Sequence, residues 1–291
     1  MWGAAAVTVA AVLVTLLCAR YFRVGIWQPV ARRRLERFAR RQSLAVTVAG
    51  GQLLIDYLAT RRRWRGGGLL LSAVGSVALP VLVQVLGPPG LIRGNGFTVS
   101  FIALFAGWFA GAVVAEWRIN VVVCGSHRSA SLRPRRLAEY LPRGAWVLPA
   151  AMWLLLGLAD LGGVAFLAAV HPGGLAPLIL WTVADIAVAA VLLTAGRRVL
   201  VRSQRIASAD VVQADDAIRS RSLHVLAGSA LTVGGYLLTA TVYALAPSST
   251  VLADGVAGVL GVVCGLVLPL FGYLTATTIS GPVRRRGPEP A

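Results

Sequence analysis

The hydrophobic residues of this chain are grouped into long, nearly uncharged runs separated by arginine-rich segments. A helix needs about 20 mostly apolar residues to cross roughly 30 Å of hydrocarbon, because it rises about 1.5 Å per residue. Seven runs reach this length. We therefore predict an all-α integral membrane protein, a polytopic helical bundle of about seven transmembrane helices, with spans near residues 2–19, 68–87, 97–117, 146–170, 176–196, 223–245 and 252–277.

The order of these runs predicts one separate N-terminal span followed by a bundle of six, a 1+6 arrangement. Pro and Gly lie in the three turns expected outside, as a reversal of chain direction requires. In the first run the positive charge follows the apolar residues, at Arg20 and Arg23, so a retained anchor is favoured over a cleaved signal peptide. The expected parts are an N-terminal anchor (1–19), an Arg-rich cytoplasmic segment (20–66), a six-helix bundle in three hairpins (67–283) and a cytoplasmic tail (284–291).

The arginines predict the orientation. Basic residues in short loops are retained on the cytoplasmic side during insertion. With the N-terminus outside and the C-terminus inside, 27 of the 28 basic residues are cytoplasmic and only Arg93 is external. This distribution explains the net charge of +17 without a nucleic-acid partner, and none is expected.

Composition narrows the class further. Of the 291 residues, 57% are hydrophobic and 13% are charged, whereas a soluble domain has about 25% charged residues. A secreted disulfide scaffold, a disordered chain and an ordinary cytosolic enzyme are therefore excluded. Every basic residue is Arg, and Ala, Gly and Val are abundant. This usage is typical of a bacterium with GC-rich DNA, so we expect the cytoplasmic membrane as the location.

The first cytoplasmic segment contains a basic helix. Pro29 suits the first turn of a helix over residues 30–41, in which Leu35 and Phe38 share a face. We expect this apolar face to lie in the headgroup boundary, with arginines on anionic lipid. The alternative is a solvated basic connector. The candidate lipid contacts are Arg32, Arg33, Arg37, Arg40 and Arg41.

Residues 43–59 are apolar enough to raise the question of an eighth span. They are short for a crossing and have arginines on both sides, one group of which a crossing would strand outside. We interpret them as a cytoplasmic helix-turn or re-entrant element that buries Leu54, Ile55 and Leu58.

The third cytoplasmic loop predicts a helix over residues 209–221, capped by Ser208 and leading into the sixth span. Arg219 can pair with Asp215 at i,i+4 and with Asp216 at i,i+3. An exposed helix joined to a membrane span could dock a partner, and a merely solvated connection is the alternative. The candidate docking residues are Asp210, Asp215, Asp216 and Arg219.

Standard catalytic motifs are absent from the sequence. Without Lys the chain cannot form a phosphate-binding P-loop, and it has no H-E-x-x-H, G-x-S-x-G or C-x-x-C. The histidines (127, 171 and 224) and the cysteines (18, 124 and 264) are dispersed, so no metal site, cofactor or disulfide is expected. We therefore do not expect an enzyme.

Two acids interrupt adjacent spans. Asp160 lies 11 residues before His171, and Asp185 lies 11 residues after Gly174, so both are expected about 16 Å below the external turn. A carboxylate at that depth costs about 2.5–3.5 kcal/mol, and mutual repulsion favours one shared proton. The sequence predicts either an intramembrane proton or cation site or two protonated, hydrogen-bonded acids with a structural role.

Two classes of function remain. The first is the membrane-spanning or accessory subunit of an ATP-driven transporter, whose ATPase is a separate chain. The second is a non-transporting membrane scaffold or regulatory subunit. Small residues, at Gly107 and Gly111 and again at Gly261 and Gly265, mark packing faces in either case.

Overall fold

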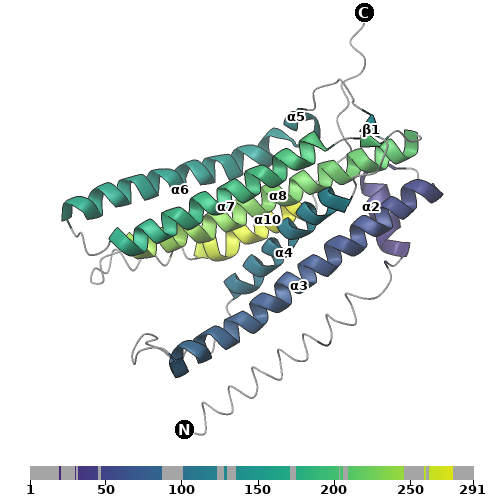
Figure 1. The fold of residues 1–291 in the computed structure, drawn as a ribbon. Helices are drawn as coiled ribbons and strands as arrows, with labels where there is room; N and C mark the ends of the chain where they lie inside the picture. The colour runs from purple at the N-terminus through teal and green to yellow at the C-terminus, as the bar shows by residue number, and fades with distance from the viewer. Residues whose placement is uncertain are drawn as a thin grey trace, which may run out of the picture. The chain divides into compact units, whose positions relative to one another are not determined.

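The described residues of the computed structural model are almost entirely helical (Figure 1). The structure describes residues 20, 30, 32–44, 47–86, 101–122, 128–129, 136–170, 175–202, 204–205, 209–245, 259 and 262–277. They fall into two compact units, one formed by 1–30 and 58–115 and the other by 31–57 and 116–291. The expected first span, at 2–19, lies outside the described residues.

The elements follow the predicted helical order. They are α2 (Arg32–Arg41), α3 (Val48–Leu86), α4 (Phe101–Val122), α5 (Leu137–Tyr140), α6 (Arg143–Val170), α7 (Leu175–Val201), α8 (Ala209–Leu245), the π-helical turn η2 (Val263–Val267) and α10 (Leu268–Thr277). Two short strands, β1 (Arg128–Ser129) and β2 (Gln204–Arg205), pair antiparallel.

Three helices of the described chain are long and apolar enough to cross a membrane. They are Arg143–Ala169 in α6, Leu178–Val201 in α7 and Ala209–Val242 in α8. Large apolar side chains on α6 and α7 are exposed, for example Leu161 and Leu193. An apolar surface of this kind fits a lipid environment, and the helices indicate a membrane protein.

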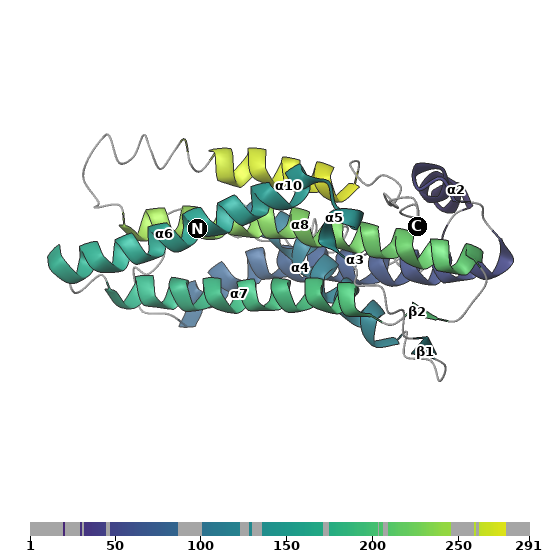
Figure 2. The same cartoon turned by 90° about the horizontal axis from the view of Figure 1, so that it is seen from above.

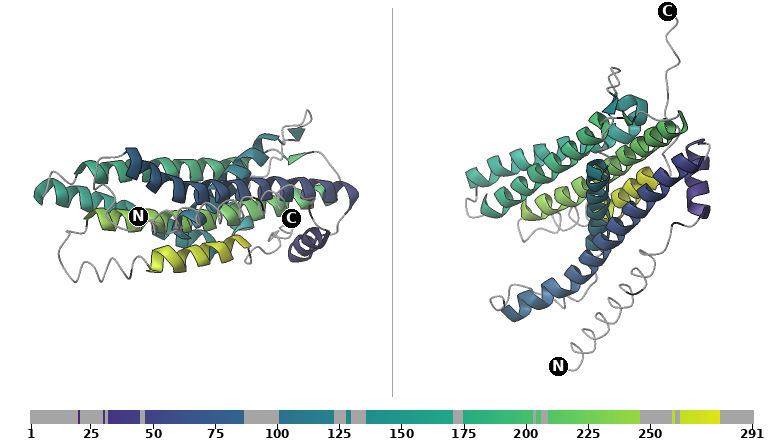
Figure 3. Two further views of the ribbon diagram at one scale, coloured as in Figure 1. Left: turned by 90° about the horizontal axis from the view of Figure 1, so that it is seen from below. Right: turned by 45° about the vertical axis from the view of Figure 1, so that its right-hand side comes forward.

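Helix α8 is the centre of the second unit. It packs against α10, α6 and α7, and the views in Figures 2 and 3 show these helices side by side. In its apolar window 56% of the residues are buried, against 28% in α6 and 22% in α7. The side chains of α8 therefore face protein on most sides, whereas α6 and α7 each keep a broad outer face.

Glycine allows two helix pairs to approach closely. A Cβ on Gly228 of α8 would lie 2.3 Å from the carbonyl oxygen of Gly272 of α10. Within the first unit, a Cβ on Gly107 of α4 would lie 2.5 Å from the carbonyl oxygen of Gly68 of α3, and one on Gly111 would lie 2.2 Å from that of Trp64. The predicted packing role of Gly107 and Gly111 is confirmed.

Helix α3 corrects one prediction. Residues 48–59 are not a helix-turn or re-entrant element, because they begin a helix that continues without a break to Leu86. Thr47 caps this helix, and its hydroxyl accepts the N–H of Gly50 at 3.2 Å. Arg and Leu are good helix formers, so the arginine run at 61–65 lies inside the helix and does not end it.

The glycine contacts give a stability prediction. Gly228→Ala and Gly272→Ala place a methyl group against backbone, which cannot move aside, so each should lower stability by about 1–3 kcal/mol. Gly162→Ala is the matched control, because a Cβ at Gly162 meets nothing within 4 Å. The measurement is the thermal midpoint of the purified protein in mild detergent. Equal midpoints for all three variants would contradict the close α8–α10 contact.

Candidate functional site

The structure brings Asp160 and Asp185 together inside the bundle. Asp160 lies ten residues before the end of α6 and Asp185 ten residues after the start of α7. Because these antiparallel helices follow one another in the chain, equal spacing places the two acids at one level. Each is only 4% exposed, and the two side chains lie close enough to interact. The two acids thus lie near one another in the structure, and a proton or cation role for the pair stays a prediction.

A third helix completes the acid site. The hydroxyl of Thr241 on α8 donates a hydrogen bond to Oδ1 of Asp160 at 3.1 Å. Thr241 is itself fully buried. The sequence analysis missed this residue, because α8 carries many hydroxyl side chains and only the packing of α8 against α6 selects one. We call Asp160, Asp185 and Thr241 the acid site.

The two carboxyl groups of the acid site differ in their hydrogen bonds. Neither carboxyl oxygen of Asp185 receives a hydrogen bond from an N–H or O–H group of the described residues. Two ionised carboxylates in contact repel one another, whereas one proton between them turns the contact into a hydrogen bond. In the part of the chain that is described, no group of three or more His, Cys, Asp and Glu side chains could hold a metal ion.

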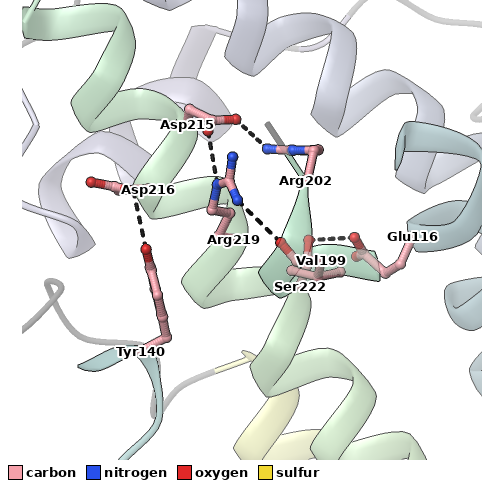
Figure 4. Close-up of polar contacts among 8 residues, drawn as sticks. All are labelled: Glu116, Tyr140, Val199, Arg202, Asp215, Asp216, Arg219 and Ser222. Atoms are coloured by element: carbon pink, nitrogen blue, oxygen red, sulfur yellow. Dashed lines mark hydrogen bonds and ion pairs between the residues drawn. The ribbon is translucent and has the colours of Figure 1, made fainter. Parts of the chain in front are cut away.

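A second buried polar group lies where α7 ends, and we call Arg202, Asp215 and Arg219 the ion cluster. Figure 4 shows Asp215 between the two guanidinium groups. Nε of Arg219 is 2.8 Å from Oδ2 of Asp215, and Arg202 contacts the other carboxyl oxygen. Arg219 is only 1% exposed, and it also donates to the carbonyl oxygen of Val199 at 3.2 Å. The predicted i,i+4 pair is confirmed.

Further polar contacts surround the ion cluster. Glu116 of α4 accepts hydrogen bonds from Ser222 and from the hydroxyl of Tyr57, the latter at 3.3 Å. The hydroxyl of Tyr140 on α5 donates to Asp216 at 3.4 Å (Figure 4). These contacts were not predicted, since their partners are far apart in sequence. The predicted Asp216–Arg219 pair stays a prediction.

The start of α8 is not the exposed helix that the sequence suggested. Asp215 and Arg219 are buried, and Asp210 accepts a hydrogen bond from Thr47, which caps α3. The carboxylates therefore join segments of this chain to one another. The expected exposure of this helix is wrong for Asp215 and Arg219, and a docking role for the helix stays a prediction.

Burial makes Asp215 the electrostatic centre of the ion cluster. Desolvation lowers the pKa of the Arg202 guanidinium, and the nearby Asp215 carboxylate opposes that shift. Loss of Asp215 would leave both guanidinium groups without the carboxylate that they contact. Removing one partner of a buried pair costs about 3–5 kcal/mol, because the remaining charge stays desolvated.

We therefore expect Asp215→Asn to lower the thermal midpoint in detergent strongly. Asp216→Asn is the matched control, because it removes the same charge one residue away, at a half-buried side chain that accepts a hydrogen bond from Tyr140 at 3.4 Å. Its effect should be below about 1 kcal/mol. If Asp216→Asn lowered the midpoint as much as Asp215→Asn, the number of negative charges near this end of the bundle, and not the contacts of the ion cluster, would determine its stability.

The contacts above are the basis for inferring a function. No family model, curated protein sequence or solved structure matches the chain. Any functional inference therefore has to begin with the chemistry of the acid site and the arrangement of the helices that carry it.

Proposed function

We propose that the protein is a seven-span protein of the bacterial cytoplasmic membrane with its N-terminus outside and its C-terminus inside. The arginine distribution supports this topology. The directions of the helices also support it. Trp153 and Asp160 of α6 contact Ala230 and Thr241 of α8, so α6 and α8 run in parallel with α7 returning between them in the sequence. Alternating directions are what three successive spans require.

Within this topology, we propose that the protein is a membrane component of a transport system in which the acid site binds and releases a proton. The observation that carries the proposal is the buried contact between Asp160 and Asp185. Acids in membrane helices are expensive, and they commonly mark ion and proton pathways. A purely structural role would be served by a neutral amide, which needs no proton.

Proton binding at this site is expected to change how three helices pack. With one proton, the protonated carboxyl group donates to the other, and Thr241 donates to Asp160. The contact then holds α6, α7 and α8 together. After the proton leaves, the two carboxylates repel and require water or a cation between them. A change in protonation is thus converted into a change in helix separation, which is the step that a transport protein needs.

The energy source proposed for transport is a separate ATPase chain. The sequence has no Lys for a P-loop, so ATP hydrolysis of that kind would have to come from a partner. The competing function is a non-transporting scaffold or regulatory subunit. It is favoured by the hydrogen bond from Thr241, which satisfies one oxygen of Asp160 without any transported ion.

The acid site is tested by infrared spectroscopy of the purified protein across a pH titration. We expect a protonated carboxyl band in the wild type that is lost in Asp160→Asn and in Asp185→Asn, since either amide leaves a single acid without its partner. Both variants should keep the elution volume of the wild type. Asp56→Asn is the control, because Asp56 is exposed on α3 and should not contribute to the band. A wild-type spectrum without a titrating carboxyl band would contradict the proposal.

The topology is tested by single-cysteine labelling in a background that lacks Cys18, Cys124 and Cys264. Val48→Cys and Gln213→Cys are suitable positions, because both side chains are exposed and both are expected to be cytoplasmic. An impermeant thiol reagent should label them only after the cells are opened. Ser248→Cys, in a turn expected outside, is the positive control. Labelling of position 48 or 213 in intact cells would reject the topology.

The partner is tested by purifying the tagged protein in mild detergent and identifying the chains that remain bound. A bound ATPase would support the transport proposal. Isolation of the protein alone, under conditions that preserve other membrane complexes, would favour the scaffold.

A further inference from the structure

Helix α2 presents a strongly basic face outside the bundle. Its ten residues contain six arginines and one acid, Glu36, which pairs with Arg32 at 2.8 Å. Residues 33, 37 and 40 follow the i, i+4, i+7 spacing of one helical face. All three are exposed arginines, and we call them the outer face of α2: Arg33, Arg37 and Arg40.

The opposite face of α2 packs on the chain itself. Ala39 is buried, and the ring of Phe38 lies 6.3 Å from the ring of Tyr57 at the start of α3. Protein covers part of the apolar side of the helix, on which Leu35 and Phe38 are half-buried, and the expectation that this side lies in the headgroup boundary stays a prediction.

The end of α2 is fixed in position. Ser43 adopts a left-handed conformation, with φ 51°, and the N–H of Leu44 donates to the carbonyl of Ala39 at 2.9 Å. This pattern closes the helix in the manner of a Schellman motif. Further along the chain, Thr47 caps α3 and donates a hydrogen bond to Asp210 at the start of α8. The outer face is therefore held on a structured support.

A second contact sets the level of α2 along the membrane helices. The guanidinium of Arg41 donates to the carbonyl oxygen of Thr277 at 2.7 Å. Thr277 is the last residue of α10, an apolar helix with exposed Leu270 and Phe271 side chains. The end of such a helix lies where the hydrocarbon gives way to headgroups. Arg41 thereby ties α2 to the headgroup level.

We propose that the outer face of α2 binds the headgroups of anionic phospholipids in the leaflet that it adjoins. Guanidinium groups bind phosphate through two parallel hydrogen bonds, and three of them on one face match a layer of lipid phosphates. Arg41 is a positioning residue, because its side chain contacts Thr277. The proposal requires only that α10 enters the membrane, and it is independent of proton binding at the acid site.

The test uses the full-length protein in a neutral detergent, titrated with phosphatidylglycerol and, in parallel, with phosphatidylcholine. Native mass spectrometry counts the lipids retained. We expect the wild type to prefer phosphatidylglycerol, and the combined Arg33→Gln, Arg37→Gln and Arg40→Gln variant to bind it roughly 100-fold more weakly, since each arginine at the surface contributes about a factor of five. Added salt should weaken wild-type binding.

Two further variants make the outcome specific. Combined replacement of Arg136, Arg143 and Arg197 by Gln removes the same charge from exposed positions elsewhere, and it should change binding less than threefold. Lysine at positions 33, 37 and 40 keeps the charge and should retain most of the preference. Equal binding of the two lipids by the wild type, or full binding by the Gln variant of the outer face, would overturn the proposal. Competition by a DNA oligonucleotide at the strength of phosphatidylglycerol would also overturn it, because the face would then be a general anion site.

Discussion

The pairing of buried charges where α7 meets α8 is the constraint on which the second unit depends. Arg219 is almost completely enclosed, so its guanidinium must find every hydrogen-bond partner inside the protein. It takes one from its own helix, Asp215, and one from the last turn of α7, the carbonyl of Val199. A helix C-terminus carries partial negative charge, so this arrangement also suits the end of α7. The bond to Val199 joins the last turn of α7 to the central helix, and the bond to Asp215 holds the guanidinium in place for it.

The two polar groups of α8 differ in how their charges are balanced. In the ion cluster, two arginines contact one carboxylate. Nearby hydroxyl groups donate hydrogen bonds to Glu116 and Asp216. In the acid site, two carboxyl groups adjoin, and the hydroxyl of Thr241 donates a hydrogen bond to one of them. In the first arrangement opposite charges attract one another, whereas in the second two ionised carboxylates would repel. This difference is why the acid site, and not the larger cluster, is the better candidate for a function.

The sequence predicted those features that depend on spacing along one or two helices. Long apolar runs gave the helices of the bundle, equal distances from a turn gave the Asp160–Asp185 contact, and an i,i+4 interval gave the Asp215–Arg219 pair. Contacts between remote helices were missed, because no local pattern distinguishes Thr241 from other hydroxyl residues of α8 or selects Gly228 as the partner of Gly272. Helix α3 was misjudged for another reason. The arginines at 61–65 were interpreted as the end of a cytoplasmic element. A helix can nevertheless carry arginines where their side chains reach water or headgroups.

The depth of the acid site also has an electrical consequence. Ten residues of α6 and of α7 separate the two aspartates from the adjoining helix ends, a distance of about 15 Å, which is half of a typical hydrocarbon thickness of roughly 30 Å. A proton that moves to this level from one side crosses about half of the membrane voltage. Transfer of a full charge across the whole membrane is worth about 2.3 kcal/mol per 100 mV, so in the proposed topology half of that would act on a proton bound at this level. Occupancy of the two aspartates would then follow the voltage of the cell as well as the acidity of the solution.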